Sequence, residues 1–338
     1  MTPHPPDGDR VTIHDVARAA GVSRQTVSNA VNNPDRVRAD TLERVRAAID
    51  ELGYHPSSSA QSLRNRRAGA IGVELHTLGS HNATTAPVLT ALSLRAARFD
   101  CHVVPFGSET GHPMLEGYRT MWAGRLVDAF LLAETHHGDP RPPWLEDQGI
   151  PYATFGRVWD DPTFTRWVDV DGGAGTRAAV EHCLTQGYRR VGFLGWPSGS
   201  VVGDDRREGW HRAAVAADAL GPEGEAEQDL DDAVRAATGL LGHLSPGDAV
   251  VCASDVLALG VHHAAVRAGL EPGADLGIVG FDGSETASMH HLTSVAQPFD
   301  AIAEESLRLV SSALVGDPAP DEGRLLLPTL TTSRSTRA

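Results

Sequence analysis

TIHDVARAAGVSRQTVSNAVNN, residues 12–33, predicts two short helices joined by a tight turn. Thr12 is placed to cap the first helix, and Asp15 follows at the spacing of a capping box. Gly21 ends that helix, because glycine readily takes the left-handed conformation that closes one. Ser23 supplies a side-chain cap for the second helix. The stretch therefore predicts a helix-turn-helix unit.

The second helix has a polar outer face. Val27 and Val31 lie one turn apart and are expected to point inward. The residues left outside are Arg24, Gln25, Ser28 and Asn29. In the major groove, arginine can bond guanine through two atoms, and glutamine or asparagine can bond adenine in the same way. This face predicts base reading, although a solvated surface helix has the same pattern.

A third amphipathic helix is expected over residues 40–52, where Gly53 stops it, and it completes a three-helix core. The following segment, residues 56–67, is rich in serine and arginine and carries one bulky apolar residue, Leu63. Two such segments, paired on DNA, could fold into minor-groove helices with each Leu63 wedged between base pairs. A plain flexible linker is the other interpretation.

The charge of the chain is unevenly distributed. Its formal net charge is −15, yet residues 1–67 hold ten arginines against eight acidic residues. Residues 68–338 hold 19 arginines against 36 acidic residues. Phosphate attracts the first part and repels the second, so the segregation favours DNA binding by the head alone.

The run continues through PDRVRADTLERVRAAIDELGYHPSSSAQSLR to residue 64, and the whole of it resembles the head and hinge of the LacI/GalR family of bacterial repressors. By this resemblance the bases are read by Arg24, Gln25 and Asn29. The DNA backbone is contacted by Ser23, Thr26, Ser28, Asn32 and Tyr54. Ala60 and Leu63 stand at the hinge-helix contact and the wedge, and Thr12 completes the predicted DNA-binding set. Serines at positions 57–59 depart from the family pattern, which leaves the helicity of the hinge without DNA open.

After residue 67, apolar strands alternate with amphipathic helices. A first set of strands is predicted at 70–75, 102–106, 129–133 and 151–155, with helices at 85–99 and 112–123. A second set is predicted at 167–171, 191–195, 249–253 and 276–281, with helices at 174–186, 204–219 and 255–268. The alternation indicates an α/β fold of two doubly wound parallel-sheet lobes.

These patterns give a domain organisation. It runs as a disordered N-terminus (1–10), a helix-turn-helix domain (11–55), a hinge (56–67) and an effector-binding and dimerisation domain (68–338). Within the last, one lobe is predicted at 68–166 with 297–324, and the other at 167–296 with 325–338.

Ligands of such sheets sit beyond the carboxyl ends of the strands. The polar and aromatic candidates there are His76, Trp159, Trp196, Ser254, Asp282 and Gln297. Planar hydrogen-bonding groups with aromatic faces suit a sugar. These candidates and their neighbours also have structural interpretations. Tryptophan often packs in cores. Asp255 with Ser254 could cap a helix, and Asp171 could be either a cap or a ligand contact.

The sensor region resembles the periplasmic-binding-protein-like domain of the same family, through motifs such as DDRREGW, ASDVLALGV and GIVGFDG. The resemblance places Arg206 and Asp282 at the main effector-gripping positions, with Gln297 and Ser254 lining the pocket. FGRVW, WVDVDGGAGT and FLGWPSGSVVGDDRREGW are similar to actinobacterial repressors of cellobiose and maltose genes. This implies a glucoside disaccharide as effector, in preference to a purine.

Other function classes fit less well. No apolar run could span a membrane and no secretory signal is evident, so we expect a cytoplasmic location and no exported sugar-binding protein. The chain ends without a heptad-bearing tail, so a homodimer is expected on a near-palindromic operator. Catalysis by the pairs Asp169 with Asp171 or Asp204 with Asp205 is the remaining alternative. Cys101, Cys183 and Cys252 predict buried, reduced thiols, and no catalytic, cofactor or metal site is predicted.

Overall fold

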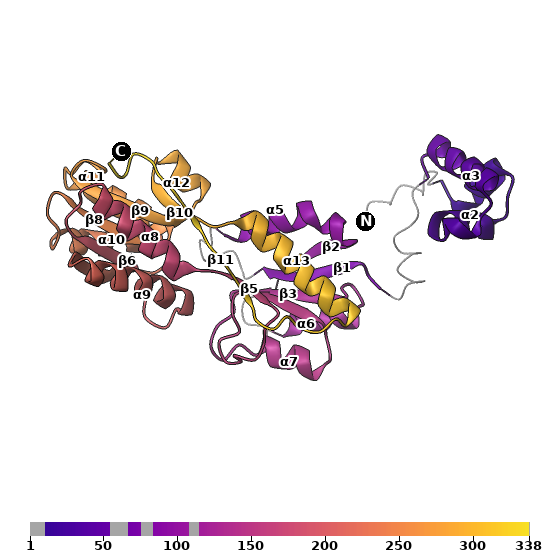
Figure 1. Ribbon diagram of the computed structural model, residues 1–338, viewed down its shortest axis with the longest axis horizontal. Coiled ribbons are helices and arrows are strands. Elements are labelled where there is room, and N and C mark those ends of the chain that lie inside the picture. The colour runs from indigo at the N-terminus through magenta and orange to yellow at the C-terminus, as the bar shows by residue number, and fades with distance from the viewer. Residues whose placement is uncertain (1–10, 55–66, 76–83, 108–114, 338) are drawn as a thin grey trace, which may run out of the picture. The chain divides into compact units, whose positions relative to one another are not determined.

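The computed structural model describes residues 11–54, 67–75, 84–107 and 115–337. The chain divides into two compact units, residues 1–68 and 69–338 (Figure 1). The expectations for residues 1–10, for the hinge residues Ala60 and Leu63, and for His76 lie outside the described residues.

The first unit is a bundle of three α-helices. These are α1 (Ile13–Ala20), α2 (Arg24–Asn32) and α3 (Ala39–Leu52), with a short 3-10 turn, η1 (Pro34–Arg36), before α3. Gly21 and Gly53 adopt the left-handed conformation at the ends of α1 and α3, as their positions predict. The small core contains Val16, Val27 and Val45, each fully buried. The predicted helix-turn-helix architecture is confirmed.

The second unit contains two six-stranded sheets. The first has the strand order β11-β5-β4-β3-β1-β2, and all of its pairs are parallel. Its strands are β1 (Ala70–Leu75), β2 (His102–Gly107), β3 (Ala129–Ala133), β4 (Tyr152–Phe155), β5 (Trp167–Val170) and β11 (Arg324–Leu326). Its helices are α5 (Thr85–Ala96) with η2 (Ala97–Phe99), α6 (Glu116–Ala123), α7 (Arg141–Asp147) and α13 (Phe299–Val315). Helix α13 packs on β3, β4 and β5.

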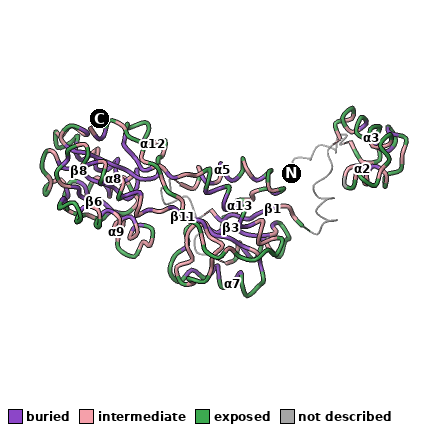
Figure 2. The backbone as a smooth tube through the Cα atoms, in the orientation of Figure 1, coloured by how far each residue is buried: buried purple, intermediate pink, exposed green. Residues whose placement is uncertain are grey.

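The second sheet has the order β12-β10-β9-β8-β6-β7, and only β12 runs antiparallel to its neighbour. Its strands are β6 (Val191–Gly195), β7 (Leu220–Glu225), β8 (Asp248–Cys252), β9 (Leu276–Asp282), β10 (Thr293–Ala296) and β12 (Thr329–Thr331). Its helices are α8 (Gly172–Thr185), α9 (Val201–Ala216), α10 (Leu230–Leu241), α11 (Asp255–Arg267) and α12 (Glu285–Met289). Burial is continuous along β6, β8 and β9, as in strands covered on both faces (Figure 2).

The chain passes between the lobes after β5, after β10 and after β11. The sequence analysis assigned strand 167–171 to the second lobe, and this is wrong. Thr154 on β4 pairs with Trp167, and Val168 pairs with Arg324 on β11, so β5 belongs to the first sheet. For the same reason the last boundary between the lobes falls after Leu326, and not after residue 324.

Strand β7 was not predicted. Its sequence, LGPEGE, has two glycines and a proline and none of the β-branched residues that mark a strand. It forms because it pairs with β6 at the edge of the sheet, where proline is tolerated. Among the described helices none is both long and apolar enough to cross a membrane.

Candidate functional site

One face of helix α2 packs against the core of the first unit. The Ser23 hydroxyl accepts the Thr26 amide N–H at 3.1 Å, which confirms the predicted cap. Val27 and Ala30 are buried against the bundle core, so the helix cannot rotate without exposing them. The residues of α2 on the other side are thereby aimed away from the core.

The outward side chains of α2 include the three predicted base readers. Arg24 and Gln25 are exposed, and Asn29 is half-buried. Gln25 Nε2 donates to Asn29 Oδ1 at 3.1 Å, so the two amides are held together on one helix face. Each retains donor and acceptor capacity, as bidentate contact to a base requires. The geometry is compatible with base reading and leaves that assignment a proposal.

Thr12 and Tyr54 have structural roles in the helix bundle. The Asp15 carboxylate accepts from the Thr12 amide at 3.0 Å and from the Thr12 hydroxyl at 2.6 Å, and these bonds lower the pKa of Asp15. Tyr54 packs on the bundle core, and its partial burial raises its pKa. Ser28 and the backbone of Asn32 lie on α2, and the side chain of Asn32 is outside the described set.

A cavity of about 520 Å³ lies between the two lobes of the second unit. Its walls come from loops that follow β3, β4, β6 and β9, together with the first turns of α9. The carboxyl ends of the strands therefore face it, as expected for this sheet type. Four of the predicted effector residues line it with Arg206: Trp159, Trp196, Asp282 and Gln297.

Arg206 on α9 is a buried arginine with incomplete hydrogen bonding. Its guanidinium lies 3.7 Å from the centre of the Phe281 ring, and Nη1 donates to the Ala253 carbonyl oxygen at 2.5 Å. Nη1 is also 3.5 Å from Asp282 Oδ1. Its Nε is buried and has no partner within the described part of the chain. Burial lowers the pKa of Arg206. A buried N–H without an acceptor is unfavourable, so a ligand oxygen that accepts from Nε would stabilise the complex.

Asp282 closes β9 with a positive φ of 115°. A residue other than glycine is strained there, as is common at binding sites. Gln297 Nε2 donates to its Oδ1 at 2.7 Å. Burial raises the pKa of Asp282 to about 7 in spite of the nearby Arg206. The carboxyl group is thus balanced between its two charge states.

Trp196 is held by Gln228, which is itself held by Ser254. Its Nε1 donates to Gln228 Oε1 at 2.7 Å, and the Ser254 hydroxyl donates to the same oxygen at 2.7 Å. Ser254 is fully buried and caps α11 by accepting the Leu257 amide at 3.3 Å. Ser254 does not line the cavity, so its prediction as an effector contact is not supported. Asp255, predicted as the cap, instead accepts from Ser284 and Ser294.

Gln228, which lines the cavity, was missed by the sequence analysis. It precedes α10 in a polar loop, where no local pattern distinguishes it from a solvated glutamine. Glu134, Thr135, Asp169 and Glu227 also line the cavity without having been named as contacts. Only the folded structure, in which loops distant in sequence come together, shows that these residues line the cavity.

The carboxylates considered as an acid and base pair have other partners. Asp169 binds Arg157 Nε at 2.9 Å, and burial nevertheless raises its pKa. Asp171 caps α8 by accepting the Ala174 amide at 2.7 Å, as one of its two interpretations predicts. Asp204 accepts the Gly199 amide at 3.1 Å, and Asp205 lies 3.4 Å from Arg157 Nη2. Neither pair is arranged around a shared reacting position.

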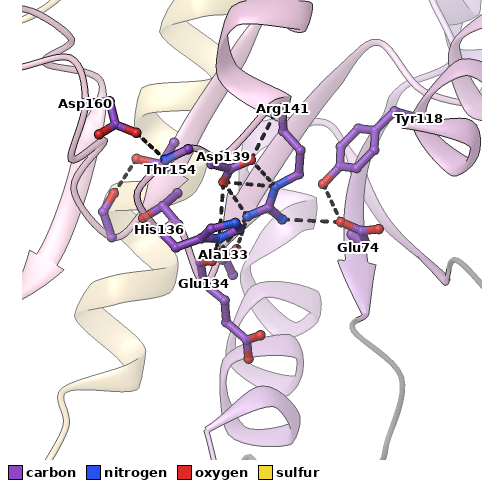
Figure 3. A network of polar contacts seen from close by, with 12 residues as sticks. Glu74, Tyr118, Ala133, Glu134, His136, Asp139, Arg141, Thr154 and Asp160 are labelled. Atoms are coloured by element: carbon purple, nitrogen blue, oxygen red, sulfur yellow. Dashed lines mark hydrogen bonds and ion pairs between the residues drawn. The ribbon is translucent and has the colours of Figure 1, made fainter. Parts of the chain in front are cut away.

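A second buried arginine, Arg141, lies within a network of polar contacts in the first lobe (Figure 3). Arg141 at the start of α7 is 0% exposed. It donates to both oxygens of Asp139, to Glu74 Oε2 at 3.2 Å, and to the carbonyls of Ala133 and Glu134 at 3.0 and 3.3 Å. Tyr118 donates to the same Glu74 oxygen at 3.0 Å. This network holds the loop after β3, whose residues 134–136 line the cavity.

Comparison with known proteins covers both units. Residues 12–57 match the profile of "Bacterial regulatory proteins, lacI family", and residues 180–336 match that of a periplasmic binding protein-like domain. The chain is 32% identical over 333 residues to the HTH-type transcriptional regulator CelR of Thermobifida fusca. The aligned region covers 95% of this chain and 96% of CelR.

Two solved structures are similar over nearly the full length. The complex of transcriptional regulator CelR with cellobiose has 29% identity and a TM-score of 0.68, and covers 96% of this chain and 100% of that one. The lac repressor dimer bound to operator and the anti-inducer ONPF has 28% identity and a TM-score of 0.78, with coverage of 98% and 100%.

Proposed function

The chain belongs to the lacI family of bacterial regulatory proteins, and from this premise we propose that it represses carbohydrate-utilisation genes until a sugar releases it from a near-palindromic operator. Membership makes the chain a DNA-binding transcriptional regulator and not an enzyme. The operator, the effector and the response are the proposed part.

The observation that carries the proposal is the polarity of the cavity. Arg206 offers an unpartnered N–H, and Asp282 offers a carboxylate beside the Gln297 amide. A sugar hydroxyl both donates and accepts, so a ring with several hydroxyls can satisfy these groups together. Trp159 from one lobe and Trp196 from the other supply aromatic surface for the C–H faces of sugar rings.

The size of the cavity and the relative in complex with cellobiose favour a glucoside disaccharide. A volume of about 520 Å³ lies within the range of pockets that enclose a drug-sized ligand. The regulator solved with cellobiose is similar to this chain over nearly its full length. A purine is the alternative effector, and the acidic groups and tryptophans of the cavity suit it less well.

The proposed regulator is a homodimer in the bacterial cytoplasm. A similar repressor has been solved as a dimer on its operator. A two-fold protein reads a two-fold site, so each α2 would enter one half-site. The residues proposed to contact DNA are Thr12, Ser23, Arg24, Gln25, Thr26, Ser28, Asn29, Asn32, Tyr54, Ala60 and Leu63. Sugar and operator would then be linked reciprocally through the dimer.

The test combines two measurements on the purified full-length chain. Thermal-shift screening against cellobiose, maltose and adenine or guanine identifies the ligand, and operator titration with and without that ligand measures the response. We expect stabilisation by a disaccharide and at least about tenfold weaker operator binding in its presence, within the usual range of allosteric coupling. Stabilisation by a purine alone, or a sugar that leaves operator binding unchanged, would overturn the proposal.

A further inference from the structure

We propose that the cavity selects an uncharged sugar and excludes the phosphorylated form of the same sugar. This inference rests on the proposed function and specifies the chemical class of its effector. It is based on the charges that line the cavity and on the hydrogen bonds and ion pairs that the nearby positive groups already make with the protein.

The ionisable lining of the cavity is mainly acidic. Each lobe contributes two carboxyl side chains: Glu134 and Asp169 from the first, and Glu227 and Asp282 from the second. Among the described lining residues, Arg206 is the only arginine. A ligand that enters therefore meets carboxylates on both sides.

The one lining arginine is poorly placed to hold a phosphate. Phosphate recognition usually uses the two-pronged edge of a guanidinium, with parallel N–H groups directed at two oxygens. Nη1 of Arg206 already donates to Ala253 and faces Asp282. The edge of the guanidinium that carries Nη1 is therefore already engaged by the protein, which makes it a poor clamp for a phosphate dianion.

Arg157 does not reverse this balance. Its Nε donates to Asp169 and its Nη2 lies 3.4 Å from Asp205, so two carboxylates share its charge. Its guanidinium also lies 4.5 Å from the centre of the Trp159 ring. The Arg157 guanidinium is therefore paired with the carboxylates of Asp169 and Asp205, and it does not line the cavity.

The N-terminus of α9 is a further positive element beside the cavity. Ser200, Val201 and Val202 line the cavity, and the start of a helix attracts anions. Side-chain oxygens of the protein already accept backbone N–H groups at this helix N-terminus. Ser200 Oγ accepts the Gly203 amide at 3.3 Å, and the Asp204 carboxylate accepts the Gly199 amide at 3.1 Å. A phosphate here would lie against the Asp204 carboxylate.

Electrostatic repulsion sets the size of the effect. A phosphate monoester carries about −1.5 to −2 charges at pH 7. At an effective dielectric constant of about 20, repulsion from two carboxylates at an assumed separation of about 10 Å weakens binding by at least about 100-fold. The effector must consequently come from a reaction that leaves the sugar unmodified, such as hydrolysis of a longer glycan. A phosphoryl transfer during uptake would abolish the signal.

The experiment compares cellobiose with cellobiose 6′-phosphate by isothermal titration calorimetry on the full-length chain. The variant Glu134→Gln/Glu227→Gln removes one carboxylate from each wall, at two exposed positions where glutamine keeps the shape of the side chain. The control Glu116→Gln/Glu208→Gln removes the same charge from two exposed positions, one in each lobe, that do not line the cavity. Glu227→Gln alone serves if the double variant does not fold.

We expect the phosphorylated sugar to bind the native chain at least about 100-fold more weakly than cellobiose. The gap should narrow by about tenfold in the cavity variant and by less than about twofold in the control. Equal or tighter binding of the phosphorylated sugar, or a gap that both variants change equally, overturns this inference and leaves the sugar sensor standing. Failure of both sugars to bind, with a purine binding in their place, overturns the proposed function itself.

Discussion

The second unit contains two buried arginines that are satisfied to different degrees. Arg141 directs its guanidinium at two carboxylates and two backbone carbonyls (Figure 3). Arg206 has one carbonyl at hydrogen-bond distance, one carboxylate at 3.5 Å and one orphaned N–H. Both side chains are at most 5% exposed, so neither is solvated like an arginine at the surface.

The difference separates a structural charge from a binding charge. Burial disfavours the charged form of Arg141, but its hydrogen bonds to Asp139 and the interactions with Asp139 and Tyr118 together outweigh burial, and the pKa of Arg141 is raised. Burial prevails at Arg206, and its pKa is lowered. A saturated arginine has nothing left to offer a ligand, while an unsaturated one lowers its free energy by gaining one. Four measurements test this difference, in order of decreasing expected effect.

Arg141→Met should have the largest effect, on stability. The substitution removes the arginine that pairs with Asp139 and Glu74 and holds the loop after β3. The free energy of unfolding is expected to fall by about 3–5 kcal/mol, measured by urea denaturation. Arg98→Met, at an exposed position 3.8 Å from Glu304, should change it by less than about 0.5 kcal/mol. A loss below about 1 kcal/mol for Arg141→Met would show that the network is not structural.

Arg206→Met should have the second effect, on binding. Sugar affinity is expected to fall at least about 100-fold, because a buried charged hydrogen bond to the ligand is lost. The free energy of unfolding should fall by no more than about 1–2 kcal/mol, since Asp282 can take up a proton once its partner is gone. Calorimetry and urea denaturation measure the two quantities. Arg212→Met, exposed on the same helix, is the control, and equal sugar affinity in both variants would refute the contrast.

The pH dependence of Asp282 provides the third measurement. Its folded pKa of about 7 lies above the ordinary value of 3.8. Between about pH 4 and 7 the folded state therefore holds a proton that the unfolded state has lost, and stability contributed by this group falls as pH rises through that window. A sugar hydroxyl that donates to the carboxylate favours the ionised form. Sugar affinity should consequently rise by up to about tenfold per pH unit below 7 and level off above it.

The Asp282→Asn variant isolates this group. Asparagine keeps the shape and does not titrate, so both the fall in stability and the rise in sugar affinity should flatten. Calorimetry from pH 5 to 8 measures affinity, and thermal melts over the same range follow stability. A native affinity profile that is already flat would place the bound sugar away from the Asp282 carboxylate.

Ser254→Ala should have the smallest effect. It removes one hydrogen bond to Gln228 Oε1, which then holds the Trp196 ring less firmly, and sugar affinity is expected to fall about 3–10-fold. Ser284→Ala removes a similar helix cap, on α12, and should cost comparable stability, about 1 kcal/mol, without changing sugar affinity. Sugar-dependent tryptophan fluorescence should change only in the first variant. Identical sugar affinities would leave Ser254 a cap and nothing more.

The prediction from sequence succeeded where a signal is local. The capping of α1 and α2, the glycine stops and the apolar spacing of α3 are all written within a few residues, and the structure has them. The strands that are buried along their length were predicted for the same reason. Strand β7 was not, because its edge position allows residues that carry no strand signal.

The site was predicted in part. The strand-end rule and the family resemblance together identified Trp159, Trp196, Arg206, Asp282 and Gln297, all of which line one cavity. They misjudged Ser254, since a residue next to a strand end can face the wall as well as the ligand. They could not identify Gln228, because its importance comes from Trp196 and Ser254, which lie 32 and 26 residues away in the chain.

The helix-turn-helix head and the α/β class of the sensor follow from the sequence, because caps, glycine stops and apolar periodicity act over a few residues. The family follows from the resemblance of longer motifs. The tertiary structure alone decided that β5 joins the first sheet, that Ser254 faces Gln228, and that Arg141 is saturated while Arg206 is not. The physical reason is that strand partners and hydrogen-bond saturation depend on groups brought together from distant parts of the chain. No short window of sequence contains both sides of such a contact.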